Sequence, residues 1–365
     1  MSLSAIGFTA ILALPWALKF LWAPYVDRFG SERYGRRRSW ILPLQALGVL
    51  LLLALAHFPP EHGLGALLAA VALTNLVAAT QDVATDGLAV DSLAPSERGY
   101  GNGVQVAGYR AGMIVGGGLI LALLEQLGWA LACRLLAVGL FLSSLPLLFA
   151  GEPATRPRPQ APRLPSLWST LRRPGFASWL ALLTAFKLGD ALGGGMLRPF
   201  LVDLGQSKTE IGWMLGIGGF TTGLLGALAG GAGVSLLGRR RALLGFGLLQ
   251  ATGMGVYVGA ALLEPGFWAL SLLIGYEHFV GGMATAALFT LMMDACDPEA
   301  AATDYTLQAC VVVLATGGAS ALSGVVAERL TYAGLFALAA VLAVVGTLVF
   351  VRDPRVERPE EVSSE

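Results

Sequence analysis

Charge is scarce in this sequence. Of its 365 residues only 13% are charged, whereas 55% are hydrophobic and the mean hydropathy is +0.69. A water-soluble chain of this length needs far more charge to cover its surface, so the composition excludes an ordinary soluble globular protein. The 24 basic and 24 acidic residues cancel, and this balance does not indicate binding to nucleic acid or to an acidic partner.

Metal-binding and nucleotide-binding motifs are also missing. The three cysteines, Cys133, Cys296 and Cys310, stand apart in apolar stretches, and we interpret them as small buried hydrophobic residues. No G-x-x-x-x-G-K-[ST] sequence occurs, so ATP is not the expected source of energy. The glycine triplets Gly116–Gly118 and Gly193–Gly195 favour close helix packing over a phosphate loop. We therefore expect no cofactor, no metal and no enzymatic activity.

Long apolar runs dominate what remains. A helix needs about 20 apolar residues to cross about 30 Å of hydrocarbon, and backbone groups there must find partners within the segment, which favours helices. The runs also lack the two-residue alternation of a membrane β-barrel. The sequence predicts an all-α polytopic membrane protein with about 11 transmembrane helices. The predicted segments run near 3–24, 39–57, 64–91, 101–125, 128–150, 176–202, 209–234, 240–262, 266–294, 304–327 and 330–351.

Lysine and arginine are distributed asymmetrically between the connectors. If the connector from Arg28 to Arg38 is cytoplasmic, the connectors on its side hold 17 basic residues, and the opposite side holds only Lys208 and Arg329. Cytoplasmic loops of membrane proteins carry the excess of positive charge. We therefore expect a multi-pass protein of a bacterial-type inner (plasma) membrane, with Met1 outside and the C-terminus in the cytoplasm.

The chain repeats itself at an offset of about 204 residues. Ser2–Phe8 matches Ser207–Trp213, and the GRRR motif at Gly35–Arg38 recurs at Gly238–Arg241. Further matches at nearly the same offset include LQALG with LQATG and Asp91 with Asp294. The two halves therefore run in the same direction through the membrane, as parallel repeats do.

The repeat and the connectors predict a division into parts. Residues 1–150 form an N-terminal bundle of five transmembrane helices, 151–175 a cytoplasmic linker, 176–351 a C-terminal bundle of six, and 352–365 a cytoplasmic tail. Because Ser2 already matches the start of the second helix of the second half, a plan of six plus six leaves the first helix of the N-terminal half missing. A wrongly assigned start and a real truncation would both explain this, and both stay open.

Two such halves, each with a basic motif after its second helix, resemble the major facilitator superfamily. That family's motif is roughly G-x-x-x-D-R-x-G-R-R. In APYVDRFGSERYGRRR, Asp27 and Arg28 keep their places and an insertion displaces the basic cluster, whereas the second copy lacks the Asp-Arg pair. The stretches LKFLWAPYVDRF, ATQDVATDGLAV, ERGYGNGVQVAGYRAGM and YEHFVGGMATAALF are similar to AmpG-type muropeptide permeases and RhtX/FptX-type siderophore importers.

This resemblance implies a two-bundle transporter that alternates between outward-open and inward-open states. It implies proton-coupled import of a medium-sized polar solute, siderophore-like or muropeptide-like, with the proton as coupling ion. We expect the protein to act as a monomer with a small-molecule substrate and the lipid bilayer as its partners. Since the first helix normally lines the cavity, a non-transporting receptor or an inactive truncated transporter remnant is the alternative.

Ionisable residues inside the predicted helices mark a candidate site in the first half, because they are costly in lipid. Asp82 and Arg110 each lie roughly 14 Å deep in their helices. Asp82 is either a proton or substrate site or the ion-pair partner of Arg110, and Arg110 could instead bind a substrate carboxylate. Asp86, one turn closer to the cytoplasm, is expected to pair with the basic connector.

The second half offers two further candidate pairs. Lys187 and Asp190 lie three residues apart, and either form a self-contained pair or take part in proton coupling. Glu277 and His278 lie roughly 16 Å deep and could relay a proton. Glu277 is the favoured member, since adjacent residues on a helix diverge by about 100°.

A gate-like motif is the last prediction. Its expected function is a charge network across helix ends that holds one conformation, and its basic residues also serve as a topology signal. Lys19, near the inner end of the first segment, is expected to extend its amine to the membrane surface. The gate candidates are Asp27, Arg28, Arg36, Arg37 and Arg38, with Asp91, Glu97 or Arg98 as their partners.

Overall fold

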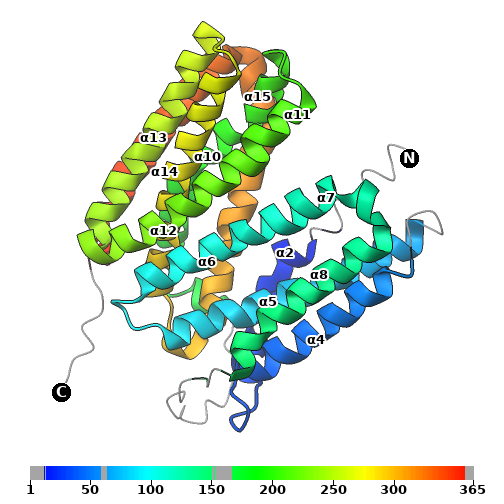
Figure 1. Cartoon of the computed structure of the whole chain (residues 1–365). Coiled ribbons are helices and arrows are strands. Elements are labelled where there is room, and N and C mark those ends of the chain that lie inside the picture. The colour runs from blue at the N-terminus through cyan, green and yellow to red at the C-terminus, as the bar shows by residue number, and fades with distance from the viewer. Residues whose placement is uncertain (1–11, 13, 59–63, 150–151, 153–166, 358–365) are drawn as a thin grey trace. The chain divides into compact units, whose positions relative to one another are not determined.

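The computed structural model describes residues 12, 14–58, 64–149, 152 and 167–357, and these form helices and short connectors with no β-strand among them (Figure 1). The predicted all-α class is therefore confirmed. Several predictions fall on residues outside this part of the chain: the repeat segment 2–8, residues 3–11 and 13 of the first apolar segment, most of the linker 151–175 and the end of the tail 352–365.

Nine of the described helices are long and apolar enough to cross a membrane. The longest, α15, is interrupted at Thr331 (φ 63°, ψ 174°) and comprises two successive helices, as predicted from the segments 304–327 and 330–351. The total of 11 stays a prediction. The long helices are α4 (Arg38–Leu55), α5 (Leu64–Ser92), α6 (Arg98–Gly112) with α7 (Ile120–Ala122), α8 (Leu124–Phe149), α10 (Phe176–Asp203), α11 (Lys208–Ile211) with α12 (Phe220–Leu237), α13 (Arg239–Leu263), α14 (Phe267–Asp294) and α15 (Ala301–Phe350).

The described part of the first apolar segment consists of short pieces rather than one helix. These are α2 (Leu14–Leu18), a 3-10 turn (Lys19–Leu21) and α3 (Ala23–Arg28). Pro24 lies in the first turn of α3, where its missing N–H leaves no helical hydrogen bond unmade. The helical path therefore extends beyond residue 24 and brings Asp27 to a helix end.

The glycine of each GRRR motif adopts a conformation that other residues rarely reach. Gly35 has φ +90° and Gly238 has φ +81°, and each precedes the arginines that lead into a helix, α4 or α13. A side chain at positive φ is strained, so glycine permits the sharp turn into each helix. The repeat seen in the sequence is thus a repeat of backbone geometry as well.

The chain separates into two compact units, and each contains a segment from the other half of the sequence. Unit 1 spans Met1–Ser92, Leu119–Arg173 and Cys296–Cys310. Unit 2 spans Leu93–Gly118, Pro174–Ala295 and Val311–Glu365. In unit 1, α4 packs against α5 and α8, and in unit 2, α12 packs against α6 and α14 (Figure 1). The division at residues 150 and 176, drawn from the repeat, stays a prediction.

Candidate functional site

The candidate residues of the second half form one polar cluster in unit 2. On α10, Lys187 Nζ lies 2.5 Å from Asp190 Oδ2. On α14, His278 Nδ1 lies 2.8 Å from Glu277 Oε2 and 3.1 Å from the carbonyl oxygen of Ile274, one turn earlier. His278 also interacts electrostatically with Asp190, so the two predicted pairs belong to one site.

Two residues that sequence analysis missed complete the cluster, and both come from α13. Tyr257 donates its hydroxyl to Glu277 Oε2 at 3.5 Å. Gln250 is 1% exposed and interacts electrostatically with Asp190. Gln250 belongs to LQATG, the counterpart of LQALG in the first half. A polar residue that recurs at the same place in both apolar halves could have marked it as a candidate.

Arg110 faces this cluster from α6 and has no ion pair there. It interacts electrostatically with Glu277 and Asp190, yet among the described residues of unit 2 no carboxylate lies within 4.0 Å of its guanidinium. A guanidinium presents a planar set of donors that matches a carboxylate bidentately. Arg110 is thus the cation of this cluster that is available to an anionic ligand.

The acidic candidates of the first half, Asp82 and Asp86, form a second cluster, in unit 1, around Lys19. Its amine makes an ion pair with Asp82 and lies 4.0 Å from Asp86, while Trp16 places its ring 5.5 Å from the amine. Lys19 is 6% exposed, so the prediction that it reaches the membrane surface was wrong. Two carboxylates one helical turn apart attract it inward. Asp86, expected at the basic connector, shares this lysine instead.

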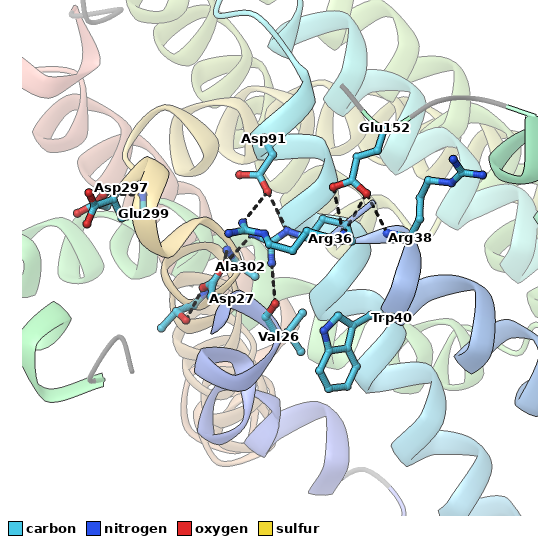
Figure 2. A network of polar contacts seen from close by, with 12 residues as sticks. Val26, Asp27, Arg36, Arg38, Trp40, Asp91, Glu152, Asp297, Glu299 and Ala302 are labelled. Atoms are coloured by element: carbon cyan, nitrogen blue, oxygen red, sulfur yellow. Dashed lines mark hydrogen bonds and ion pairs between the residues drawn. The ribbon is translucent and has the colours of Figure 1, made fainter. Parts of the chain in front are cut away.

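The gate motif forms a buried network in unit 1 that is centred on Arg37. Arg37 is fully buried and donates to Asp27 Oδ1 at 2.7 Å and to Asp91 Oδ2 at 2.8 Å, and Arg36 reaches Asp91 at 3.2 Å. Figure 2 shows Asp27, Asp91 and Glu152 around this arginine segment. Burial alone would lower the pKa of Arg37, but Asp27 and Asp91 outweigh it and raise that pKa above its ordinary value. Arg37 therefore stays charged.

Asp27 also caps the start of α15, which belongs to the other half of the sequence. Its carboxylate accepts hydrogen bonds from the backbone N–H of Ala302 at 3.2 Å and of Thr303 at 2.7 Å, and from the Thr303 hydroxyl at 2.6 Å. A helix N-terminus carries unpaired N–H groups and partial positive charge, which a carboxylate satisfies. The end of α3 is thus joined to the first turn of α15.

The remaining gate candidates have other partners. Glu152 accepts from the backbone N–H groups of Arg37 and Arg38, at 3.0 and 3.1 Å for one of its oxygens. Arg28 is exposed at the end of α3. Of the three proposed acidic or basic partners, Asp91 contacts the arginines, Glu97 binds the backbone N–H of Ala94, and Arg98 pairs with Asp294 at 2.8 Å.

The pairing of Asp294 repeats that of Asp91. Asp294 also binds Arg239 at 3.0 Å, and these two residues are the counterparts of Asp91 and Arg36 at an offset of 203. Each half thus ties the end of one long helix to the start of another through an aspartate and the GRRR arginines. The second copy lacks a counterpart of Asp27, since that position is Gly230.

Comparison with known proteins assigns this chain to a family. The family model described as Major Facilitator Superfamily matches residues 1–190 and 188–365. The chain belongs to the major facilitator superfamily. It is a multi-pass membrane protein with the two-bundle fold of that family, as the sequence resemblance predicted.

Among its relatives is the anhydromuropeptide permease of Escherichia coli (strain K12), which is 33% identical over 313 residues. That match covers 84% of this chain, and the chain spans 63% of the length of the permease. Similar solved structures are a bacterial homologue of the iron transporter ferroportin in an outward-facing state (TM-score 0.64, 19% identity) and the transporter FucP in an outward conformation (TM-score 0.66, 14% identity). Each covers 94% of this chain and 89% of the other. The Escherichia coli relative is a permease rather than an enzyme, which agrees with the expectation of no enzymatic activity.

Proposed function

We propose that this protein is a secondary active transporter that imports a medium-sized, anionic polar solute together with a proton. The observation that carries the proposal is the unit 2 cluster, in which Arg110 faces Glu277 and Asp190 without an ion pair of its own. Ionisable groups in a membrane bundle are costly, and they mark solute and proton paths. A muropeptide-like solute is favoured over a siderophore-like one, because a relative at 33% identity is an anhydromuropeptide permease.

Charge balance in the cluster supports proton coupling. With a neutral imidazole at His278, the positive charges of Arg110 and Lys187 match the negative charges of Asp190 and Glu277. A substrate carboxylate bound to Arg110 adds one negative charge, which is expensive to hold uncompensated in a low-dielectric bundle. A proton taken up on the Glu277–His278 pair restores the balance. Substrate and proton therefore bind favourably together.

The gate network gives this site its alternating access. Asp27, with Arg37 and Asp91, joins α3 to the start of α15 and stabilises the conformation in which these helix ends touch. The unit 1 cluster of Lys19, Asp82 and Asp86 carries one excess negative charge and is a second candidate for proton binding. The protein is proposed to be a monomer of the bacterial inner membrane with its C-terminus in the cytoplasm.

Uptake by the reconstituted full chain tests this proposal. Labelled anhydromuropeptide and a labelled ferric siderophore are offered separately to proteoliposomes, with and without an inward proton gradient. We expect gradient-stimulated uptake of the muropeptide, and its loss in Arg110→Ala but not in Arg134→Ala, an exposed arginine of α8 in unit 1. If only the siderophore is taken up, the proposed substrate is wrong. If Arg110→Ala takes up muropeptide at the wild-type rate, the proposed site is wrong.

A further inference from the structure

Helix α12 presents glycines toward α6 and α14, the two helices that carry Arg110, Glu277 and His278. The preceding π-helical turn (Gly212–Gly219) continues this glycine pattern. Small residues let membrane helices approach closely. Close packing would therefore explain all of these glycines if each one lay against the backbone of a neighbouring helix. The glycines on this face are Gly219, Gly223, Gly226, Gly230 and Gly231.

The three glycines nearest the cytoplasmic GRRR motif do meet backbone. A Cβ at Gly230 would lie 2.5 Å from the Cα of Met283 on α14, and one at Gly231 would lie 2.7 Å from the Cα of Gly103 on α6. A Cβ at Gly226 would overlap the carbonyl oxygen of Phe279. No side-chain rotation can relieve these contacts, so these glycines serve helix packing.

The other two glycines meet the ends of site side chains instead. A Cβ at Gly219 would lie 2.6 Å from Cδ2 and 2.7 Å from Nε2 of His278. A Cβ at Gly223 would overlap Nη1 of Arg110 and lie 2.5 Å from its Cζ. The imidazole and the guanidinium thus occupy the volumes that side chains would take at these positions.

The shape of the surrounding space therefore positions both side chains. Arg110 has no carboxylate of unit 2 within 4.0 Å to hold it, so the space beside Gly223 is what places its guanidinium. His278 is held at Nδ1 by Glu277 and by the carbonyl of Ile274, while its Nε2 edge lies against Gly219. A methyl group at Gly219 would have to rotate the ring and disturb both contacts at Nδ1.

We propose that Gly219 and Gly223 are positioning residues for transport, which keep space open for the His278 ring and the Arg110 guanidinium. This rests on the proposed function, because it assumes that Arg110 binds the solute and that the Glu277–His278 pair takes the proton. The same glycine face thus changes its role along the helix, from joining backbones at Gly226 and beyond to shaping the site at Gly219 and Gly223.

Alanine substitutions at two glycines of this face and at one glycine outside it give a graded test. Uptake is measured in proteoliposomes with labelled anhydromuropeptide supplied on the outside. Gly223→Ala is expected to raise the KM for uptake on the order of tenfold while folded protein is recovered normally, because a displaced guanidinium binds a carboxylate poorly. Gly216→Ala is the matched control, since a Cβ there meets nothing within 4 Å, and it should leave KM unchanged. Gly226→Ala should reduce the yield of folded protein.

A side-chain rescue separates positioning from packing. In the Gly223→Ala background, Arg110→Lys substitutes a slimmer amine for the guanidinium and should recover part of the affinity. In the wild-type background the same change should weaken binding. A lower yield of folded protein in Gly223→Ala, equal to that of Gly226→Ala and without rescue, would overturn the proposal, and so would an unchanged KM.

A measurement that does not depend on transport separates the positioning role of Gly219 from the proposed transport function. The chain has three histidines, so replacing His57 and His62 by glutamine leaves His278 as the single imidazole. Its ring ¹⁵N resonances should shift in Gly219→Ala and stay unchanged in Gly216→Ala. Shifted resonances without muropeptide uptake by the wild type would refute the function alone. Unshifted resonances, or loss of folded Gly219→Ala protein, would refute the positioning role.

Discussion

Removing the charge of Asp27 tests the gate most directly. Asp27 is 1% exposed, and its carboxylate receives an arginine side chain, two backbone N–H groups and one hydroxyl. Asp27→Asn keeps the size of the side chain but replaces one oxygen by a donor. That amide nitrogen would face other donors whichever way it points, so at least one hydrogen bond is lost and the start of α15 is left without its negative cap.

The loss can be estimated from these contacts. Breaking one partner of a buried charge pair costs about 3–5 kcal/mol, and Arg37 retains Asp91 as a second acceptor, which favours the lower end of that range. At about 1.4 kcal/mol for each factor of ten, about 3 kcal/mol weakens the closed gate on the order of 100-fold. The population with the start of α15 released from α3 should rise by that factor.

The native thiol of Cys296 reports this opening. It lies just before the start of α15, where its sulfur accepts a hydrogen bond from Gln308 Nε2 at 3.5 Å. In a variant with Cys133 and Cys310 replaced by alanine, maleimide labelling of Cys296 should accelerate in Asp27→Asn. The acceleration should be at most about 100-fold, because this half-buried thiol also reacts while the gate is closed. Glu32→Gln, an exposed carboxylate of the same connector, is the control. Equal labelling rates in all three proteins would refute the gate.

Three further predictions address the two clusters and the linker. Asp82→Asn and Glu277→Gln should each abolish uptake driven by a proton gradient while membrane insertion stays intact, and unchanged uptake in both would remove the coupling assignment. Lys19→Met should lower the free energy of unfolding by about 3 kcal/mol, because it leaves two neighbouring carboxylates uncompensated, and adding Asp82→Asn should restore part of it in thermal unfolding. Arg173→Met should lower the unfolding midpoint more than Arg172→Met, since Arg173 pairs with a fully buried aspartate at the start of α15.

The sequence determined the membrane class, the family and the repeat. Long apolar runs predict spanning helices because lipid offers backbone groups no partner, and the structure confirms the all-α fold. The GRRR repeat predicted related helix ends, and Gly35 and Gly238 share a positive φ there. Depth within a predicted helix can also be estimated from the sequence, so Arg110 and Glu277 are identifiable there as ionisable residues that are costly in lipid.

Only the tertiary structure decided which of these residues meet. Hydropathy places Lys19 near the end of an apolar segment, where an amine could reach water, but the carboxylates that draw it inward come from α5. Likewise, Asp27 caps a helix 275 residues away, and the glycines beside Arg110 and His278 read in sequence as ordinary packing residues. The physical reason is that lipid is as apolar as the helix surfaces, so hydropathy reveals which segments enter the membrane but not which helices pack together there.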